Sequence, residues 1–202
     1  MGIDETLAKW MPQPSGPRRK RRAVIYDFDN TLWQSHGRET GEPLYLEKTG
    51  QKWPHSGWWG RVETLMPPFV IDPITEDYFV ADVLAAYRVD RAEQNTNCYL
   101  MTGRPAKMRH RVRQLLDAAG VTFDDYYFRG MKGQPGHGDT LEIKLDLIQH
   151  QIIHPALEVL EIWEDRPEHA SRFMTEARRW KGKFDLQKIV VHEVLTNEHH
   201  EF

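Results

Sequence analysis

Two acidic residues directly follow an apolar run early in the sequence. The run Val24-Ile25-Tyr26 leads into Asp27 and, two residues later, Asp29. Because side chains alternate along an extended chain, both carboxylates should point to the same side. Ionised carboxylates at the end of a buried strand repel each other unless a cation joins them, and oxygen ligands suit a divalent ion such as Mg2+. The alternative is a strand-ending turn in which Asp29 and Asn30 cap the backbone.

Three further groups of polar residues lie at similar places. Thr102-Gly103-Arg104 offers a hydroxyl, a close backbone approach and a guanidinium that can bind phosphate through two hydrogen bonds. Lys144 lies in the first turns of an expected helix, and Glu164-Asp165-Arg166 follows the apolar run 159–163. Each group alone is usually structural, as a turn threonine, a solvated lysine or an acidic helix start. Their order and placement together are much less expected by chance than any one of them alone.

The elements that would position these groups form an α/β pattern, with short β-rich runs alternating with helical segments. We expect strands at 23–27, 98–102, 126–128, 159–163 and 188–194. We expect helices near 76–91, 105–119, 140–152 and 167–180. Crossovers of this length favour a mostly parallel sheet with helices on both faces and an active site at the carboxyl ends of the strands.

Helix-end signals support these assignments. Asp139 is placed to cap the third helix, and Glu142 is placed to reach back to it, as in a capping box. Pro167 suits the first turn of the fourth helix. In the second helix one face is apolar, formed by Met108, Val112, Leu115, Leu116 and Ala119.

The chain divides into an expected flexible basic tail at 1–22 and one domain at 23–202. Residues 33–73 interrupt the α/β pattern, because they are rich in Gly, Pro and Trp without a clean period, and we expect a small cap insertion there. Its tryptophans offer either a wall on which a base stacks or the insertion's own core; they are Trp53, Trp58 and Trp59.

Composition excludes several classes of protein. The chain has 202 residues and a formal net charge of -3 from 27 basic and 30 acidic residues, so it is not a globally basic nucleic-acid binder. Its single cysteine, Cys98, excludes a disulfide framework and a cysteine-rich zinc site, and it is more plausible as a buried side chain than as a nucleophile. No membrane-spanning run or secretory signal is visible, so we expect an intracellular protein.

Two polar features have competing explanations. The basic run at 18–22 suits a localisation signal or a phosphate-backbone contact, and equally a solubilising flank of a buried strand. The histidines lack the spacing of a helical zinc motif with a third ligand and are better explained as scattered solvated side chains; those considered are His36, His55, His137, His199 and His200.

The polar groups in their order resemble the four motifs of the haloacid dehalogenase (HAD) superfamily of phosphohydrolases. Asp27-Phe28-Asp29-Asn30-Thr31 is similar to the first motif, Thr102 to the second, Lys144 to the third and Glu164-Asp165 to the acidic fourth. The resemblance covers about residues 23 to 166. It implies a HAD-like, Rossmann-type α/β fold with a small cap after the first strand.

The same resemblance implies roles for these residues. Asp27 would be the nucleophile that forms an aspartyl-phosphate, and Asp29 the general acid and base, which starts protonated. Thr102 and Lys144 would hold the phosphoryl oxygens. Further substrate contacts would come from the motif neighbours Thr31, Gly103, Arg104 and Arg166. Mg2+ would be bound by the side chains of Asp27 and Asp165 and the backbone carbonyl of Asp29, with Glu164 a less certain ligand.

Within the superfamily, the sequence is most similar to the HAD domains of Swiss Army Knife RNA-repair proteins and to polynucleotide kinase-phosphatase. The resemblance rests on 27–33, Gly57-Trp58-Trp59 and 163–169. It implies removal of a terminal phosphate from a nucleic-acid end, with possible RNA-repair partner proteins; no kinase phosphate-binding loop is present. Two helices carry cations that either flank the active edge or form solvated faces: Lys107, Arg109, Arg111, Arg113, Arg172, Arg178 and Arg179.

Other functions remain open at this level. A phosphatase of small nucleotides or sugar phosphates would use the same core with a tighter cap. A phosphate-binding module without turnover is a different class of function, which the complete set of chemically required residues disfavours. The choice between the 3' and 5' end, between RNA and DNA, and between monomer and dimer is not encoded in these motifs.

Overall fold

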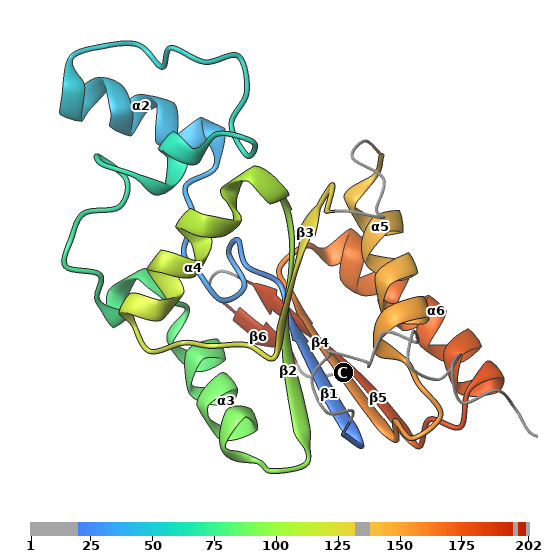
Figure 1. Cartoon of the computed structure of the whole chain (residues 1–202). Helices are drawn as coiled ribbons and strands as arrows, with labels where there is room; N and C mark the ends of the chain where they lie inside the picture. The colour runs from blue at the N-terminus through green and yellow to red at the C-terminus, as the bar shows by residue number, and fades with distance from the viewer. Residues whose placement is uncertain (1–19, 132–137, 196–197, 201–202) are drawn as a thin grey trace, which may run out of the picture.

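A parallel β-sheet forms the centre of the protein (Figure 1). The structure is a computed structural model that describes residues 20–131, 138–195 and 198–200. Within these residues the sheet has six strands in the order β3-β2-β1-β4-β5-β6. The strands are β1 (Arg22–Tyr26), β2 (Thr96–Pro105), β3 (Asp125–Arg129), β4 (Val159–Glu164), β5 (Lys188–Leu195) and β6 (Glu198–His200). Strands β1 to β5 pair in parallel and β6 is antiparallel to β5, which confirms the expected α/β fold.

Helices cover both faces of the sheet, as Figure 1 shows. On one face lie α3 (Ala81–Ala92) and α4 (Arg109–Ala118), which pack against Val24 and Tyr26 of β1. On the other lie α5 (Thr140–Leu147) and α6 (Pro167–Lys183), which pack against Ala23 and Ile25. The alternation of the β1 side chains thus supplies both hydrophobic cores. Among the described residues, no helix has the length and apolar composition needed to cross a bilayer.

The helix ends largely follow the sequence signals. The Asp139 side chain caps α5 by accepting a hydrogen bond of 2.9 Å from the Leu141 N–H. Glu142 does not complete the expected capping box; its carboxylate lies 3.6 Å from Arg172 on α6. A π-helical turn, Ile148–Ile152 (η4), follows α5 directly. Pro167 begins α6, and a 3-10 turn, Ala106–Met108 (η3), precedes α4.

The segment 33–73 contains a helix that the sequence pattern did not predict. This helix, α2 (Arg38–Thr49), is followed by two 3-10 turns, η1 (Val62–Leu65) and η2 (Glu76–Tyr78). Within the described residues 38–49, Gly41 is the one buried position, so no apolar stripe was available to reveal the helix. A Cβ atom on Gly41 would lie 2.1 Å from the Trp58 ring, which explains why the helix needs glycine there.

The insertion builds its own aromatic core. Trp53 and Trp58 pack with ring centroids 4.8 Å apart, and the Trp58 ring lies 5.4 Å from Phe69. The Trp53 indole also donates to the Gly57 carbonyl at 3.0 Å. For these two residues the structural alternative is therefore correct. Trp59 differs, because it is partly exposed and its ring faces Arg104.

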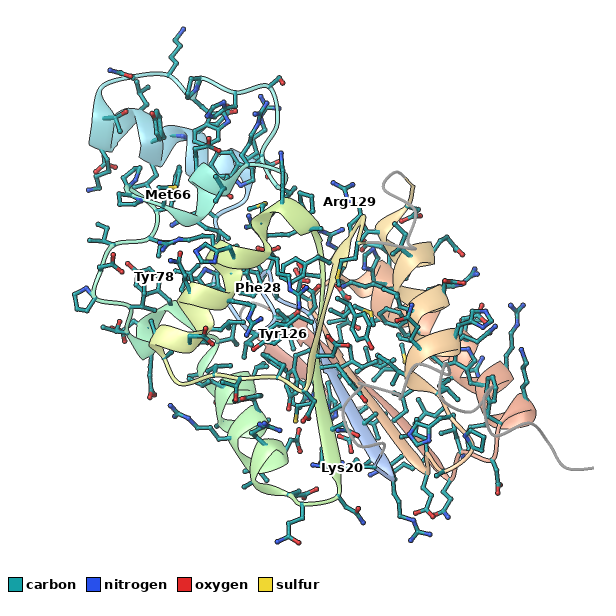
Figure 2. All side chains as sticks on the ribbon, viewed as in Figure 1. Lys20, Phe28, Met66, Tyr78, Tyr126 and Arg129 are labelled. Atoms are coloured by element: carbon teal, nitrogen blue, oxygen red, sulfur yellow. The ribbon has the colours of Figure 1, made fainter. Side chains whose placement is uncertain are left out.

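Lys20, the first described residue of the basic run, lies at the amino end of the sheet, away from the carboxyl edge where Arg129 lies (Figure 2). Lys20 donates to the Thr96 carbonyl at 2.9 Å, and Arg21 pairs with Glu158 at 2.7 Å. Arg22 forms ion pairs with three carboxylates, those of Asp90, Glu93 and Glu161. These three cations therefore stabilise the start of β1, while positions 18 and 19 lie outside the described residues.

The sequence also led to expectations for Cys98 and for several histidines. Cys98 is buried in β2, and this burial raises the pKa of its thiol to about 12, as expected for a structural side chain. His36 and His55 belong to none of the acidic or histidine clusters found among the described residues. The side chains of His137, His199 and His200 lie outside the described part of the chain.

Candidate active site

The pairing of β1 with β4 brings two acidic segments together at the carboxyl edge of the sheet. Tyr26, the last residue of β1, pairs with Trp163, so Asp27 and Glu164 follow at the same level. The Asp27 N–H donates to the Trp163 carbonyl at 3.0 Å, which fixes Asp27 beside β4. Asp165 comes immediately after the strand. Sequence positions about 137 residues apart thus become neighbours through strand register alone.

Lys144 lies between two of these carboxylates. Its Nζ atom donates to Asp27 Oδ1 and to Glu164 Oε2, each at 2.6 Å. This lysine lies on α5, which covers the face of the sheet opposite α3 and α4. All three side chains are buried, with relative exposures of 6% for Asp27, 4% for Lys144 and 1% for Glu164. Such short bonds between buried charges hold the Asp27 carboxylate in one orientation.

Acidic oxygens of Asp27, Glu164 and Asp165 all lie within 4.8 Å of one another, and this is the acidic cluster found in the part of the chain that the structure describes. The Oδ1 atom of Asp165 is buried and has no hydrogen-bond partner among the described residues. An unpaired buried carboxylate oxygen is costly unless a cation contacts it. The oxygen-rich donor set fits a hard divalent cation such as Mg2+.

The local charges perturb the acidity of this cluster. Burial, together with the negative charges of Glu164 and Asp29, raises the pKa of Asp27 to about 7 against the opposing charge of Lys144. Burial, with the charges of Asp27 and Glu164, raises the pKa of Asp165 to about 8. Burial acts in the same direction on Glu164, but Lys144 and His169 lower the pKa of Glu164 to about 2. The single positive charge of Lys144 therefore does not offset the negative charges of all three carboxylates.

His169, on α6, is a further residue at this cluster. Its Nδ1 atom lies 3.4 Å from Glu164 Oε1, at the limit of contact, and neither atom makes a well-directed hydrogen bond within the described residues. It is buried against Phe173, with ring centroids 6.5 Å apart. His169 lies in the run 163–169 that carries the family resemblance, but no role was assigned to it; its place in the first turn of α6, five residues after Glu164, was the available signal.

Asp29 lies in a separate network centred on Arg104. The Arg104 Nε atom donates to both Asp29 oxygens at 2.9 Å, and Nη2 donates to Oδ1 at 2.7 Å. The Ser35 hydroxyl donates to the same Oδ1 at 2.6 Å. Oδ2 therefore carries fewer hydrogen bonds than Oδ1. The ion pair with Arg104 and the bond from Ser35 together fix the orientation of the Asp29 carboxylate.

Arg104 does not face an open phosphate site in this conformation, which differs from the expectation for a phosphate ligand. It is 1% exposed, and its Nη1 atom donates to Thr64 Oγ1 of η1 at 2.8 Å. Its guanidinium carbon lies 5.9 Å from the Phe28 ring centroid and 5.5 Å from that of Trp59. The insertion therefore supplies a hydrogen bond and an aromatic face to the residue that orients Asp29.

The loop after Asp29 is fixed by backbone hydrogen bonds. The Trp33 N–H donates to the Phe28 carbonyl at 2.8 Å, and the Asn30 N–H donates to the Trp33 carbonyl at 2.7 Å. Asn30 has a φ of 57°, a left-handed conformation that asparagine tolerates better than most residues. Thr31 is fully buried, and its hydroxyl has no hydrogen-bond partner among the residues described, so it does not face a substrate here.

Thr102 lies one strand over from Asp27, on β2. It is buried, and its hydroxyl accepts a hydrogen bond of 3.1 Å from the Arg104 N–H. Gly103 lies against α5, where a Cβ atom would come within 2.7 Å of Thr140 Cγ2. This close approach explains the glycine. Arg166 is partly buried beside the acidic cluster, where its charge makes a small contribution that lowers the pKa of Asp165.

Sequence reasoning missed two residues of the Asp29 network, Ser35 and Thr64. Ser35 is six residues from Asp29, beyond the five-residue motif, and Thr64 lies in the insertion, 40 residues from Arg104. No motif spacing or helical period links either residue to its partner. Their roles became visible through the backbone path of the loop and the placement of η1.

Comparisons with known proteins agree with this geometry. The chain is similar to a solved structure of the Pnkp1/Rnl/Hen1 complex, with 18% identity, a TM-score of 0.50 and 90% of this chain covered, but it spans 48% of that chain. It is also similar to the Legionella pneumophila effector Ceg4, with 14% identity, a TM-score of 0.53 and 93% of each chain covered. At these identities the likeness concerns the fold. No curated protein matches the chain.

A family model matches residues 43–200, which is more than three quarters of the sequence, although Asp27 and Asp29 precede the matched range. The model describes HAD domain family 1 in Swiss Army Knife RNA repair proteins. This match confirms the resemblance noted in the sequence. The chain belongs to HAD domain family 1 of the Swiss Army Knife RNA repair proteins.

Proposed function

We propose that this protein is a Mg2+-dependent phosphohydrolase that removes terminal phosphates from nucleic-acid ends, acting together with RNA-repair partner proteins. The observation that carries the proposal is the buried cluster of Asp27, Glu164 and Asp165 around Lys144 at the carboxyl edge of the sheet. The family supports an RNA-repair role. The domain would comprise residues 23–202, with the insertion at about 33–73 serving as its cap.

Mg2+ would be held by the side chains of Asp27 and Asp165, by the backbone carbonyl of Asp29 and, as the less certain ligand, by Glu164. When bound, it would offset negative charge on the carboxylates and on the phosphate. The four carboxylates of the two networks outnumber the two cations, Lys144 and Arg104, by two charges when all are ionised. A divalent ion matches that excess.

Asp27 is the proposed nucleophile. Lys144 keeps it oriented through the bond to Oδ1, which leaves Oδ2 to attack phosphorus and form an aspartyl-phosphate as the leaving oxygen departs. Lys144 and the Thr102 hydroxyl would hold the phosphoryl oxygens, since Thr102 lies on β2, the strand that pairs with β1. Substrate contacts would also come from Gly103 and Arg166, beside Thr102 and Asp165 respectively.

Asp29 is the proposed general acid and base. Its Oδ2 atom carries fewer hydrogen bonds than Oδ1 and is the oxygen that would hold the transferred proton. The proton would pass to the leaving oxygen in the first step, and Asp29 would accept one from the attacking water in the second. Protonation for the first step would accompany substrate binding, which adds negative charge nearby.

A panel of phosphate-release assays tests the proposal. The substrates are RNA and DNA oligonucleotides with 3'-phosphate or 5'-phosphate ends, nucleoside monophosphates and sugar phosphates, each with and without Mg2+. Release from nucleic-acid ends that needs Mg2+ and disappears in Asp27→Asn is the expected result. Appreciable activity in Asp27→Asn would refute the role of Asp27, and phosphate binding without any release would support a non-catalytic module.

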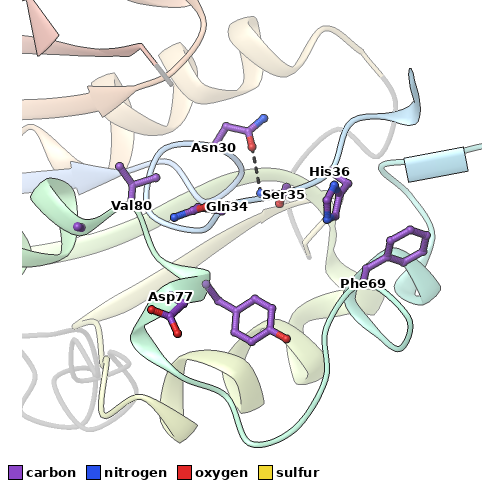
Figure 3. Close-up of a pocket in the computed structure, with 9 residues that line it drawn as sticks. Asn30, Gln34, Ser35, His36, Phe69, Asp77 and Val80 are labelled. Atoms are coloured by element: carbon purple, nitrogen blue, oxygen red, sulfur yellow. Dashed lines mark hydrogen bonds between the residues drawn. The ribbon is translucent and has the colours of Figure 1, made fainter. Parts of the chain in front are cut away.

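A small phosphorylated metabolite is the second candidate substrate, because a cavity lies next to the Asp29 loop (Figure 3). Its volume is about 580 Å³ and its lining includes Ser35, His36, Phe69 and Tyr78. The Ser35 hydroxyl connects it to Asp29. The lining combines polar side chains such as Asn30 and Asp77 with the rings of Phe69 and Tyr78, a combination that suits a nucleoside or sugar. A preference for the small substrates by orders of magnitude in the panel would favour this candidate.

A further inference from the structure

The outer face of α4 carries a basic cleft that the proposed chemistry does not use. It has a volume of about 470 Å³. The cleft residues that matter here are Lys107, Arg109, His110 and Arg113, and we refer to them as the α4 cleft. Asp117 lines the far end of the same cleft. Polar and charged groups dominate this surface, so it is unsuited to an apolar ligand or helix and suited to an anionic one.

The cations of the α4 cleft are free of carboxylate partners. Within the part of the chain that the structure describes, no ion pair joins Lys107, Arg109 or Arg113 to an acidic side chain. Arg113 instead lies over the Tyr126 ring, with its guanidinium carbon 4.9 Å from the ring centroid. This contact orients the guanidinium without neutralising it.

Basic residues on α6 behave differently. Arg172 and Arg179 both pair with Glu176, at 3.2 and 3.0 Å, and Arg172 also approaches Glu142. Their charges are thus partly compensated by the helix itself. The sequence offered the same two explanations for both helices. On α6, Arg172 and Arg179 pair with Glu176, whereas Arg178 of α6 and the cations Lys107, Arg109 and Arg113 of the α4 cleft form no ion pair with an acidic side chain among the described residues.

The α4 cleft begins at the catalytic edge of the sheet. Lys107 lies in η3, immediately after β2, the strand that carries Thr102 and Arg104. Arg129, at the end of β3, pairs in register with Pro105 and lies at the carboxyl edge in Figure 2. Its Nε atom is buried and unpartnered among the described residues. Cations therefore extend from the strand ends along α4, a ten-residue helix about 15 Å long.

We propose that the α4 cleft and Arg129 bind the phosphodiester backbone of a single-stranded nucleic acid whose terminal phosphate occupies the candidate active site. The proposal rests on the proposed function and adds the surface that distinguishes a nucleic acid from a small phosphate ester. A row of cations fits an extended chain of regularly spaced phosphates. The buried position of Asp27 and Lys144 requires an unpaired end, because a thin strand reaches a recessed site more easily than a duplex does.

The test measures equilibrium binding in the Asp27→Asn background, so that no turnover consumes the probe. The probes are single-stranded RNA of about 12 nucleotides with a 3'-phosphate or a 5'-phosphate, since single-strand sites span roughly 4–16 nucleotides. The test variant is Lys107→Gln/Arg113→Gln. The matched control is Arg178→Gln/Lys181→Gln on α6, which removes the same charge from exposed positions on the opposite face.

We expect the test variant to bind at least one of the probes roughly tenfold more weakly at low salt and to lower the slope of log affinity against log salt by about 1.4, or about 0.7 for each lost contact. The control should match the parent in both quantities. Equal losses in both variants, or no loss in the test variant, would overturn the proposal. Competition by polyglutamate as effective as that by RNA would also overturn it, since it would indicate a general polyanion surface.

A second measurement separates this surface from the catalytic proposal. With Asp27 restored, the ratio of kcat/KM for the RNA end to kcat/KM for p-nitrophenyl phosphate should fall in Lys107→Gln/Arg113→Gln and stay unchanged in the control. If instead Asp27→Asn retains full turnover, the proposed function fails while the binding result still decides the role of the α4 cleft. An unchanged ratio in the test variant contradicts the α4 proposal independently of Asp27.

Discussion

Removing the Thr64 hydroxyl should weaken the proposed acid function of Asp29 while leaving Asp29 itself unchanged. Thr64 Oγ1 accepts a hydrogen bond of 2.8 Å from Arg104 Nη1 and donates one of 2.7 Å to the Arg61 carbonyl. Thr64→Val keeps the shape of the side chain but removes both bonds. Thr64→Ser retains the hydroxyl and serves as the matched control.

The magnitude follows from burial. Thr64 is 5% exposed and Arg104 1%, so the substitution leaves a charged N–H without a partner in a dry environment. Hydrogen bonds to charged groups contribute about 1.5–3 kcal/mol, and we expect Thr64→Val to lower the free energy of unfolding by about that amount. A guanidinium released from Thr64 also orients Asp29 less well. If about 1.4 kcal/mol of that loss reaches the transition state, kcat falls about tenfold.

The assay compares leaving groups, because a proton donor matters most for a poor one. For a phosphorylated oligonucleotide or nucleoside, whose leaving alcohol needs a proton, Thr64→Val should lower kcat about tenfold, which is a part of the roughly 10²–10⁴-fold that general acid catalysis contributes. For p-nitrophenyl phosphate, whose leaving group needs no proton, the initial burst of p-nitrophenol should be nearly unchanged. Thr64→Ser should resemble the wild type with both substrates.

Two results would refute this reasoning. A proportional loss with both leaving groups would mean that Thr64 supports the fold of the site rather than the acid function of Asp29. Wild-type kinetics in Thr64→Val, together with an unchanged pH profile, would show that the contact between the insertion and Arg104 is irrelevant to catalysis. Thermal unfolding at the assay temperature confirms that each variant is folded while it is measured.

Three further predictions concern the metal, the acid stability and the close approach at Gly103. The pKa values of Asp27 and Asp165 are raised to about 7 and 8, so these carboxyl groups bind protons more tightly in the folded protein than in the unfolded chain. The resulting stabilisation of the metal-free fold is complete below a pH of about 4, the unfolded pKa, and is lost as the pH rises through about 7 to 8. Mg2+ should therefore raise Tm more at pH 8 than at pH 6, and Asp165→Asn should abolish the difference; an equal shift at both pH values would contradict the metal assignment. Although burial acts in the opposite direction, His192 and Arg22 lower the pKa of Glu161 to about 2, so its contribution to stability is present above pH 4.5 and lost as the pH falls toward 2. Glu161→Gln should accordingly cost about 1–2 kcal/mol at pH 7 after allowance for solvent screening, measured by urea unfolding, and the cost should vanish near pH 2. Gly103→Ala should reduce activity because the new Cβ meets Thr140 Cγ2 at 2.7 Å, and Thr140→Ser, which lacks that methyl group, should restore much of it; failure of the rescue would place the effect elsewhere.

Strand topology explains which parts of the site were predictable from sequence. Asp27, Glu164 and Asp165 follow apolar runs that read as parallel strands, and parallel strands end at the same edge. The position of Lys144 could be predicted because α5 begins with a recognisable cap at Asp139. Predicting where these residues lie required only the right strands and helices in the right order. It did not require the direction of each side chain.

The Asp29 network needed information that the sequence pattern does not carry. The pairing of β2 with β3 shifts between Thr102 and Pro105, so alternation does not give the direction of the Arg104 side chain. Its partner Thr64 lies in η1 of the insertion, whose α2 helix contains Pro43 and lacks an apolar face. Arg104, which was expected to bind phosphate, is therefore hydrogen-bonded to Asp29, the candidate acid.

The two networks divide the electrostatic requirements of the proposed reaction. Lys144 on α5 forms ion pairs with Asp27 and Glu164, and Arg104 on β2 forms an ion pair with Asp29. A carboxylate nucleophile must be ionised when it attacks, whereas an acid and base must change its protonation state during the reaction. One shared cation would couple the two carboxylates, so that each protonation of Asp29 would disturb Asp27. Separate cations from separate elements reduce that coupling, and because Arg104 also contacts Thr64, the orientation of Asp29 depends on the position of the insertion.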